Sequence, residues 1–208
     1  MKSKMKIRNI IKTKWIRMLD FFQDVFIFGK NFSYFEKVPK DSNSTDIVST
    51  PYCVIRKVFK NIQKTNMHFV DIGCGCGRVV SWVAKKQLFA ECTGIEINKK
   101  AFAIAIKNTK KMNNVLIKNE DAFNVNLDSF DCCYMWKPMK KDKWIELISL
   151  IPNANRNKTL ILVNDSEVFD WMSKNTDWKL LIRESFKNIY GTRISHSKSM
   201  FSIWKLNK

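Results

Sequence analysis

The chain has 208 residues, which suits a single α/β domain with an extension and excludes two domains of ordinary size. Hydrophobic residues make up 45% of it and aromatic residues 12%, so the composition excludes a disordered chain and predicts a packed core. The net charge of +18 favours an anionic partner such as nucleic acid, an acidic membrane surface or a phosphorylated substrate. A bias toward lysine without functional meaning explains the same charge, and both interpretations stay open.

The sequence has no signal-peptide pattern and no apolar run of the length that a membrane span requires. Its six cysteines form no C-x-x-C pair, and it contains only two histidines, so no metal site is expected. We therefore expect a cytoplasmic protein with buried, reduced cysteines. Peripheral contact with a membrane stays open because of the N-terminal segment.

Residues 1–49 are expected to form a basic amphipathic helix and a connecting loop. Residues 2–17 contain seven lysines and arginines and no acid, and Gly29 is expected to end the helix. That helix either packs on the domain, as a lid over a substrate pocket, or lies on an anionic membrane surface through residues 1–28. We favour packing, because Asp20 and Asp24 would be repelled by an anionic surface. The apolar residues that share one helical face are Ile7, Ile11, Trp15, Met18, Phe22 and Val25.

Residues 50–208 are expected to form one domain in which strands and helices alternate. A helix is predicted to start at Pro51, with Thr50 as its N-cap. Strands are predicted at 67–72, 92–97, 114–118, 130–136, 159–164, 178–186 and 199–206, and further helices at 78–86, 99–110, 141–150 and 167–173. This alternation predicts an α/β fold with a mostly parallel, seven-stranded, Rossmann-like sheet and helices on both faces.

The sequence VDIGCGCGR, residues 70–78, follows the first of the predicted parallel strands. Asp71 lies at the strand end, and Gly73, Gly75 and Gly77 occupy every second position after it. Glycines allow the backbone to turn sharply and to approach a ligand that side chains would exclude. A glycine-rich loop alone is a weak signal, because many tight turns look similar.

Acids at the ends of the next two strands strengthen this signal. Glu96 ends the second strand, where a carboxylate can accept hydrogen bonds from both hydroxyl groups of a ribose. Asp121 follows the third strand, where it could meet the edge of an adenine while Phe123 covers the adenine face. The carboxyl ends of parallel strands meet at one edge of the sheet, so a nucleotide-like ligand is expected there.

Over roughly residues 50–165 the sequence resembles the class I S-adenosylmethionine-dependent methyltransferases. DIGCGCGR resembles their first motif, GIEIN their second and EDAF their adenine-contacting segment. The resemblance implies S-adenosylmethionine as the cofactor and Asp71 beneath its methionine part. It implies that the glycine loop contacts the methionine part, through Gly73, Cys74, Gly75 and Gly77. The end of the second strand, Glu96 and Ile97, would contact the ribose, and EDAF would contact the adenine through Asp121, Ala122 and Phe123.

More narrowly, TPYCVIRKVFKNI resembles a segment of small, uncharacterised bacterial methyltransferases that have an S/T-P-Y helix before the glycine loop. This resemblance implies that Tyr52 lines the methyl end of the cofactor. Members of the group look like enzymes that modify surface glycans or natural products. A weaker resemblance to seven-strand lysine methyltransferases also exists.

The fourth strand departs from that pattern. Relatives show F-N-P-F where this chain has Trp136-Lys137-Pro138-Met139, and protonated Lys137 only donates hydrogen bonds, so it cannot accept one from an amine as Asn does. If Lys137 faces the site, an anionic or hydroxyl-bearing acceptor fits better than an ammonium group; if it faces solvent, it carries no information. The candidate catalytic residues are Lys137 and Asp165, as bases, and Tyr134.

Three functions stay open. The first is a methyltransferase for a small-molecule, glycan or lipid-linked acceptor with an oxygen or nitrogen nucleophile. The second is a macromolecule methyltransferase, for protein lysine or RNA, to which the positive charge would draw an anionic substrate. The third is a non-catalytic module that binds S-adenosylmethionine, because Lys137 replaces the expected Asn. We favour the first, since no recognised RNA-binding module accompanies the domain.

Overall fold

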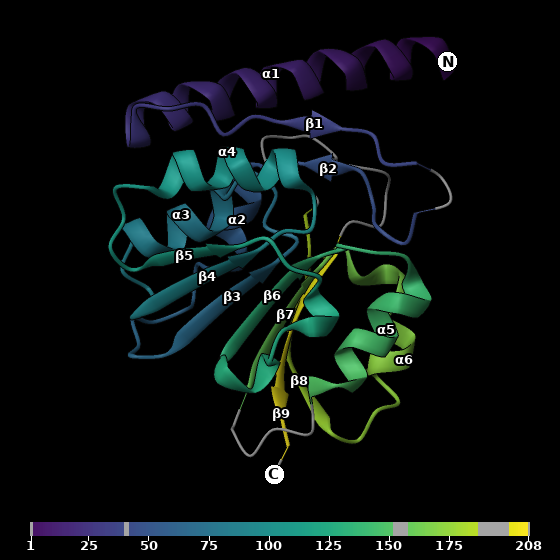
Figure 1. Cartoon of the computed structure of the whole chain (residues 1–208). Helices are drawn as coiled ribbons and strands as arrows, with labels where there is room; N and C mark the ends of the chain where they lie inside the picture. The colour runs from purple at the N-terminus through teal and green to yellow at the C-terminus, as the bar shows by residue number, and fades with distance from the viewer. Residues whose placement is uncertain (1, 40–41, 152–157, 187–199, 208) are drawn as a thin grey trace.

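A computed structural model describes residues 2–39, 42–151, 158–186 and 200–207 of the chain (Figure 1). Seven strands form one sheet in the order β5-β4-β3-β6-β7-β9-β8, and β1 and β2 form a separate antiparallel pair. The strands are β1 (Phe35–Glu36), β2 (Ile47–Val48), β3 (His68–Ile72), β4 (Glu91–Ile95), β5 (Val115–Lys118), β6 (Cys132–Trp136), β7 (Thr159–Val163), β8 (Trp178–Ser185) and β9 (Met200–Leu206). The helices are α1 (Lys2–Phe28), α2 (Tyr52–Val58), α3 (Arg78–Lys85), α4 (Lys99–Thr109), α5 (Lys141–Ser149) and α6 (Phe169–Met172).

The sheet is parallel from β5 to β7, and only β9 runs antiparallel, between β7 and β8. Successive residues of a strand point to opposite faces, and both faces are buried here. Phe69 and Tyr134 belong to a core cluster with α2, α3 and α4, whereas Val70 and Met135 belong to one with α5 and α6. The predicted Rossmann-like sheet with helices on both faces is therefore confirmed (Figure 1).

Each strand and helix predicted after residue 50 is present, with ends that shift by a few residues. The first of these helices was expected to have Thr50 as its N-cap, and this detail is wrong. Pro51 occupies the cap position of α2, and no side chain caps it. All six cysteines are buried and free of disulfides, as expected.

The N-terminal helix ends at Phe28 as predicted, because Gly29 adopts a φ of 65° and its N–H donates to the carbonyl of Val25 over 2.8 Å. Its orientation differs from the favoured prediction. Trp15 and Phe22, from the apolar face expected to pack on the domain, are 57% and 59% exposed, whereas Asp20 and Asp24 are buried. The helix does pack on the domain, but it does so through its two acids and not through the apolar face that was expected to pack.

The attachment depends on Arg78, the first residue of α3. Its guanidinium group donates to both carboxylate oxygens of Asp24, at 3.2 Å from Nε and 2.6 Å from Nη2, and lies 3.5 Å from Asp20. Asp24 also accepts hydrogen bonds from the hydroxyl of Tyr52 and from the backbone N–H of Phe32. The buried charge of each partner is compensated, and apolar contacts of Ile16, Ile27 and Phe28 with the domain add to this ionic attachment of α1. We call this cluster of Asp20, Asp24, Tyr52 and Arg78 the latch.

The loop expected at residues 31–50 contains β1 and β2 and has a definite position. Arg78 donates to the carbonyl of Thr50 and to the hydroxyl of Ser33, which fixes both ends of this segment. The segment crosses the carboxyl ends of the parallel strands beneath α1 (Figure 1). We call residues 33–39 and 42–51 the strap.

Candidate active site

The glycine loop connects β3 to α3 at the carboxyl edge of the sheet. Gly73 and Gly75 have φ angles of 75° and 55°, in the left-handed region that glycine adopts without strain. The backbone N–H groups of Gly73 and Cys74 donate to the carbonyl of Ile95 at 2.9 and 3.0 Å, which holds the loop against the end of β4. A Cβ on Gly73 would lie 3.0 Å from the Cβ of Pro138, so the loop after β6 also packs closely on it.

Gly94, near the end of β4, was not predicted to matter, but the packing around it admits only glycine. A Cβ there would lie 2.8 Å from the Sγ of Cys74 and 2.8 Å from the Cδ1 of Ile117. A residue larger than glycine would therefore push the glycine loop away from the sheet. A glycine inside a predicted strand often marks such a close approach, so the signal was present.

Two carboxylates face one another at the glycine loop. Glu96 accepts hydrogen bonds from the backbone N–H groups of Gly75 and Asn98, both at 2.8 Å. Burial raises the pKa of Glu96, and these two donors partly offset it. Burial and then the nearby Glu96 carboxylate raise the pKa of Asp71 to about 8. A bound ligand that donates hydrogen bonds or carries a positive charge would therefore stabilise the ionised form of both groups.

The third acid lies at the rim of the same cavity. Asp121 is exposed, and its carboxylate accepts a hydrogen bond from the backbone N–H of Phe123 at 3.1 Å. Ala122 is buried beside it, and the ammonium group of Lys143 lies 5.4 Å from the ring centre of Phe123. The carboxylate keeps free lone pairs toward the cavity rim, where an amino group could donate to it.

The strap forms the roof of this site. Thr45 donates through its hydroxyl to the carbonyl of Lys137 at 2.6 Å and through its backbone N–H to the carbonyl of Pro138 at 3.3 Å. The N–H of Lys140 donates to the carbonyl of Asn43 at 2.8 Å. The side-chain amide of Asn98, after β4, donates to Glu36 at 3.4 Å. The strap thus connects the loop after β4 with the loop after β6, across the point where the strand order reverses.

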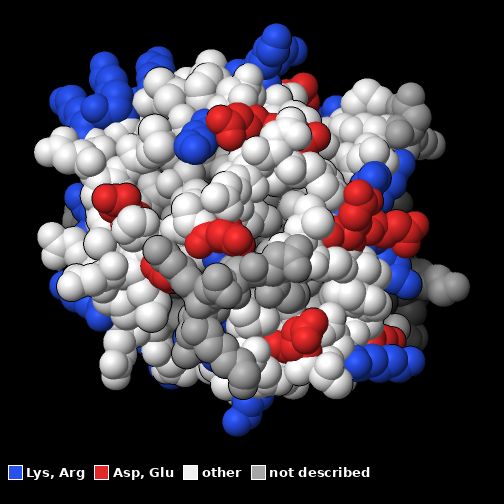
Figure 2. All heavy atoms as spheres, turned by 60° about the horizontal axis from the view of Figure 1, so that its bottom comes forward, with Lys and Arg blue, Asp and Glu red and all other residues white. Residues whose placement is uncertain are grey.

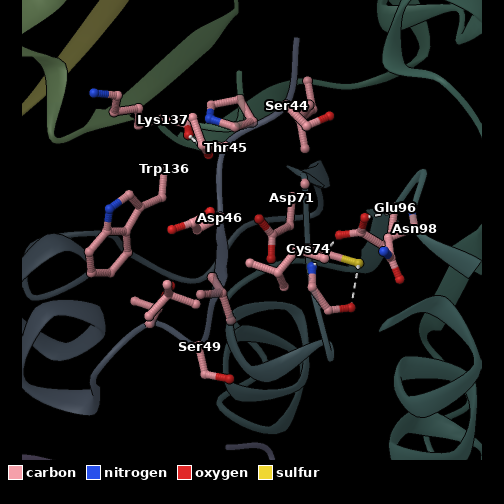
Figure 3. A pocket seen from close by; sticks show the side chains of 18 of the residues that line it. Ser44, Thr45, Asp46, Ser49, Asp71, Cys74, Glu96, Asn98, Trp136 and Lys137 are labelled. Atoms are coloured by element: carbon pink, nitrogen blue, oxygen red, sulfur yellow. Dashed lines mark hydrogen bonds between the residues drawn. The ribbon is translucent and has the colours of Figure 1, made fainter. Parts of the chain in front are cut away.

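Beneath the strap lies a cavity of about 1360 Å³. Figure 3 shows two groups of side chains around it: Asp71, Cys74, Glu96 and Asn98 on one side, and Asp46, Trp136 and Lys137 on the other. Ligand pockets commonly measure about 300–1000 Å³, so this cavity has room for a nucleoside-sized cofactor and a second molecule. The predicted residues that line the cavity are Asp71, Gly73, Cys74, Gly75, Glu96, Ile97, Asp121, Ala122, Phe123, Tyr134 and Lys137.

Three predicted site residues do not line it. Gly77 lies under the loop against α4. Tyr52, expected at the methyl end of a cofactor, is fully buried and donates its hydroxyl to Asp24 at 2.7 Å, so its place in the latch corrects that expectation. Asp165, a candidate base, is fully buried and does not line the cavity, although its neighbour Asn164 does.

The remaining candidate catalytic side chains are poor bases in this position. Lys137 has a φ of 36°, and its ammonium group forms an ion pair with Glu167 while its side chain points away from Asp71 (Figure 3). Burial, followed by the Asp71 carboxylate, raises the pKa of Tyr134 well above its ordinary value, so its hydroxyl stays protonated. Asp46 and Trp136 were not predicted; with Thr45 they line the cavity, on the side away from Glu96 (Figure 3).

Comparisons with known proteins agree with this geometry. Residues 69–154 match the family described as a methyltransferase domain. No curated protein sequence matches the chain. A Salinibacter ruber RNA methyltransferase in complex with S-adenosylhomocysteine superimposes with a TM-score of 0.59 at 15% identity, over 77% of this chain and 95% of that one.

Two further structures show that the fold serves different acceptors. A Bacillus subtilis m1A22 tRNA methyltransferase gives a TM-score of 0.59 at 14% identity, over 74% of this chain and 65% of that one. A Haemonchus contortus phosphoethanolamine N-methyltransferase, in complex with phosphoethanolamine and S-adenosylhomocysteine, gives 0.62 at 14% identity, over 74% and 42%. The match of residues 69–154 to a methyltransferase domain, together with the glycine loop, the acids at successive strand ends and the strand order, indicates an S-adenosylmethionine-dependent methyltransferase with the class I, Rossmann-like fold.

Proposed function

We propose that this enzyme methylates an oxygen or nitrogen atom of a small-molecule, glycan or lipid-linked acceptor. The observation that carries the proposal is the strap, which roofs the cavity from the loop after β4 to the loop after β6. A site covered in this way admits a compact acceptor or the end of a chain more readily than a folded macromolecule. The cavity volume of about 1360 Å³ leaves room for such an acceptor beside the cofactor.

The residues at the sheet edge fit S-adenosylmethionine. We assign the ribose hydroxyls to Glu96, whose oxygens each already accept one backbone hydrogen bond and keep a further lone pair for the ligand. We assign the adenine to Asp121, Ala122 and Phe123, and the methionine part to Gly73, Cys74 and Gly75, with Asp71 beneath it. When bound, the cofactor supplies a methyl group that its sulfonium makes electrophilic.

The chain itself aligns the acceptor, excludes water and removes a proton where the acceptor requires it. Trp136 offers a flat apolar surface on the acceptor side, and Asp46 on the strap offers a carboxylate (Figure 3). That carboxylate accepts a hydrogen bond from the backbone N–H of Val38 at 3.1 Å and keeps lone pairs for an acceptor hydroxyl or amine. We therefore propose Asp46, rather than Lys137 or Asp165, as the group that orients the acceptor.

A macromolecular acceptor, RNA or a protein lysine, is the second candidate. The net charge of +18 and the RNA and tRNA methyltransferases among the structural neighbours favour RNA. Figure 2 shows one face of the molecule, on which acidic side chains occupy the middle and most basic ones stand at the margin. Among the described residues on that face, the basic side chains form no continuous tract of the kind that follows a nucleic-acid backbone.

The test of the cofactor site is calorimetry with S-adenosylhomocysteine. Glu96→Ala removes one or two charge-assisted hydrogen bonds to the ligand and should weaken binding by about 2 kcal/mol, or roughly thirtyfold. Glu91→Ala, at the exposed opposite end of β4, is the matched control and should bind as the wild type does. Unchanged binding by Glu96→Ala would remove the ribose assignment.

The test of the acceptor uses cofactor that carries a labelled methyl group. The enzyme is incubated with separate small-molecule, lipid, glycan, RNA and protein fractions of a bacterial extract. We expect label in one of the first three fractions, and Asp46→Asn should lower it without changing the affinity for S-adenosylhomocysteine. Label confined to RNA or protein would refute the proposed acceptor class and support the second candidate.

A further inference from the structure

The outer side of α1 is apolar, aromatic and exposed. Six large hydrophobic side chains there are between 40% and 92% exposed, and Phe26 is the most exposed of them. Successive helical residues are about 100° apart, so these six lie on the side opposite Asp20 and Asp24. We call the six the outer stripe: Trp15, Met18, Phe21, Phe22, Val25 and Phe26.

This arrangement reverses the usual one, in which a surface helix buries its apolar side. The latch explains how the reversal is stable, because Asp20 and Asp24 are paired with Arg78 and hold the polar side inward. Contiguous exposed apolar patches on soluble proteins usually mark a site that binds another protein or a membrane. The outer stripe is therefore available to a partner while α1 stays attached.

The charges of α1 indicate the chemistry of that partner. Residues 2–17 contain seven lysines and arginines and no acid, and the two acids of the whole helix are both buried in the latch. The described basic side chains of this region, Lys14 and Arg17, are exposed beside the outer stripe. An aromatic stripe flanked by lysine and arginine, without an exposed carboxylate, is the pattern of a helix that lies in the plane of an anionic bilayer.

We propose that α1 binds the surface of an anionic membrane, with the outer stripe inserted among the lipids and the basic residues against their headgroups. Among the described residues, no helix is long and apolar enough to cross a bilayer. A second copy of the chain fits the outer stripe less well, because two helices with seven positive charges each would repel one another. Figure 1 shows α1 at the outside of the molecule, along one edge, where a flat surface can reach its length.

The cavity borders the same helix. Ile16 and Arg17 line it from α1, one turn or less from Trp15 and Met18 of the outer stripe. Membrane binding would therefore hold the roofed site close to the lipid surface. This inference does not depend on the identity of the methyl acceptor.

The experiment is co-sedimentation of the full-length protein with vesicles of phosphatidylcholine alone or mixed with phosphatidylglycerol. We expect the protein to sediment with the mixed vesicles only, and rising salt should release part of it. Trp15→Ser/Phe22→Ser/Phe26→Ser should lower the partition coefficient at least about tenfold, because the inserted apolar area is lost. Lys4→Gln/Lys6→Gln/Lys12→Gln should also lower the partition coefficient. Each lost charge should lower it by about fivefold or less.

The matched control replaces exposed apolar residues of other elements, Ile106→Ser/Leu116→Ser/Leu150→Ser, and should sediment as the wild type does. Binding of S-adenosylhomocysteine, measured for each variant, shows that folding and the cofactor site are intact. Wild-type protein that stays in solution with anionic vesicles refutes the proposal, and so does an equal loss of binding by the control. A dimer in light scattering that the outer-stripe variant dissociates would assign the surface to a second copy instead.

Discussion

Asp24→Ala should destabilise the protein and weaken cofactor binding, although Asp24 does not line the cavity. The substitution removes the carboxylate that accepts hydrogen bonds from Arg78, Tyr52 and the backbone N–H of Phe32. Arg78 is only 3% exposed, so its charge would be left buried. Removing one partner of a buried ion pair costs about 3–5 kcal/mol.

Asp20 moderates this effect, because its carboxylate stays 3.5 Å from Arg78. We therefore expect a loss near 3 kcal/mol, which for a chain of this size lowers Tm by about 6–12 °C. Arg78 also holds both ends of the strap, through Ser33 and Thr50. The affinity for S-adenosylhomocysteine should fall about tenfold as the roof loosens.

Differential scanning calorimetry and titration calorimetry measure the two effects. Asp170→Ala, which removes an exposed acid, is the control and should change Tm by less than about 2 °C. A Tm for Asp24→Ala equal to that of the control would show that the latch does not act as described.

Three further predictions concern the cavity floor. Gly75→Val should abolish cofactor binding in a folded protein. A β-branched residue is strained at a φ of 55°, and its side chain would enter the cavity next to Ile47. Normal binding in calorimetry would contradict this. Gly94→Ala should lower the free energy of unfolding by about 1–3 kcal/mol, because its Cβ would overlap Cys74; urea denaturation with an unchanged midpoint contradicts this. Asp71 has a folded-state pKa of about 8 against an ordinary value of 3.8, so its contribution to stability is fully present below pH 4 and is lost as the pH rises to about 8. Across this window the wild type should lose stability relative to Asp71→Asn, and parallel Tm curves for the two proteins would be inconsistent with a buried, protonated Asp71.

The sequence predicted the cavity floor well, because its signals are local. Gly73, Gly75 and Glu96 stand at strand ends, and parallel strands bring their carboxyl ends to one edge whatever the rest of the chain does. The orientation of α1 could not be predicted in this way. Its apolar periodicity indicated which residues share a face, but the partner that buries the opposite face is Arg78, 54 residues beyond Asp24.

The strap was missed for a related reason. Its polar composition is typical of a linker, and the contacts that make it a roof are hydrogen bonds to distant backbone groups, such as that from Thr45 to the carbonyl of Lys137, 92 residues away. Backbone acceptors leave no mark in the residue pattern. The error at Tyr52 arose differently. A local sequence resemblance implied that Tyr52 contacts the cofactor, but in the structure its hydroxyl donates to Asp24 in the latch.

The two attachments of the strap differ in strength, and this difference has a kinetic consequence. The ends near Ser33 and Thr50 are held by a buried guanidinium group, whereas the tip at Asn43 and Thr45 is held by three neutral hydrogen bonds. At about 1 kcal/mol each, these three bonds would leave the tip lifted in roughly one molecule in a hundred. If cofactor and product enter and leave through the lifted tip, their association rate constants would be about a hundredth of those of an open site.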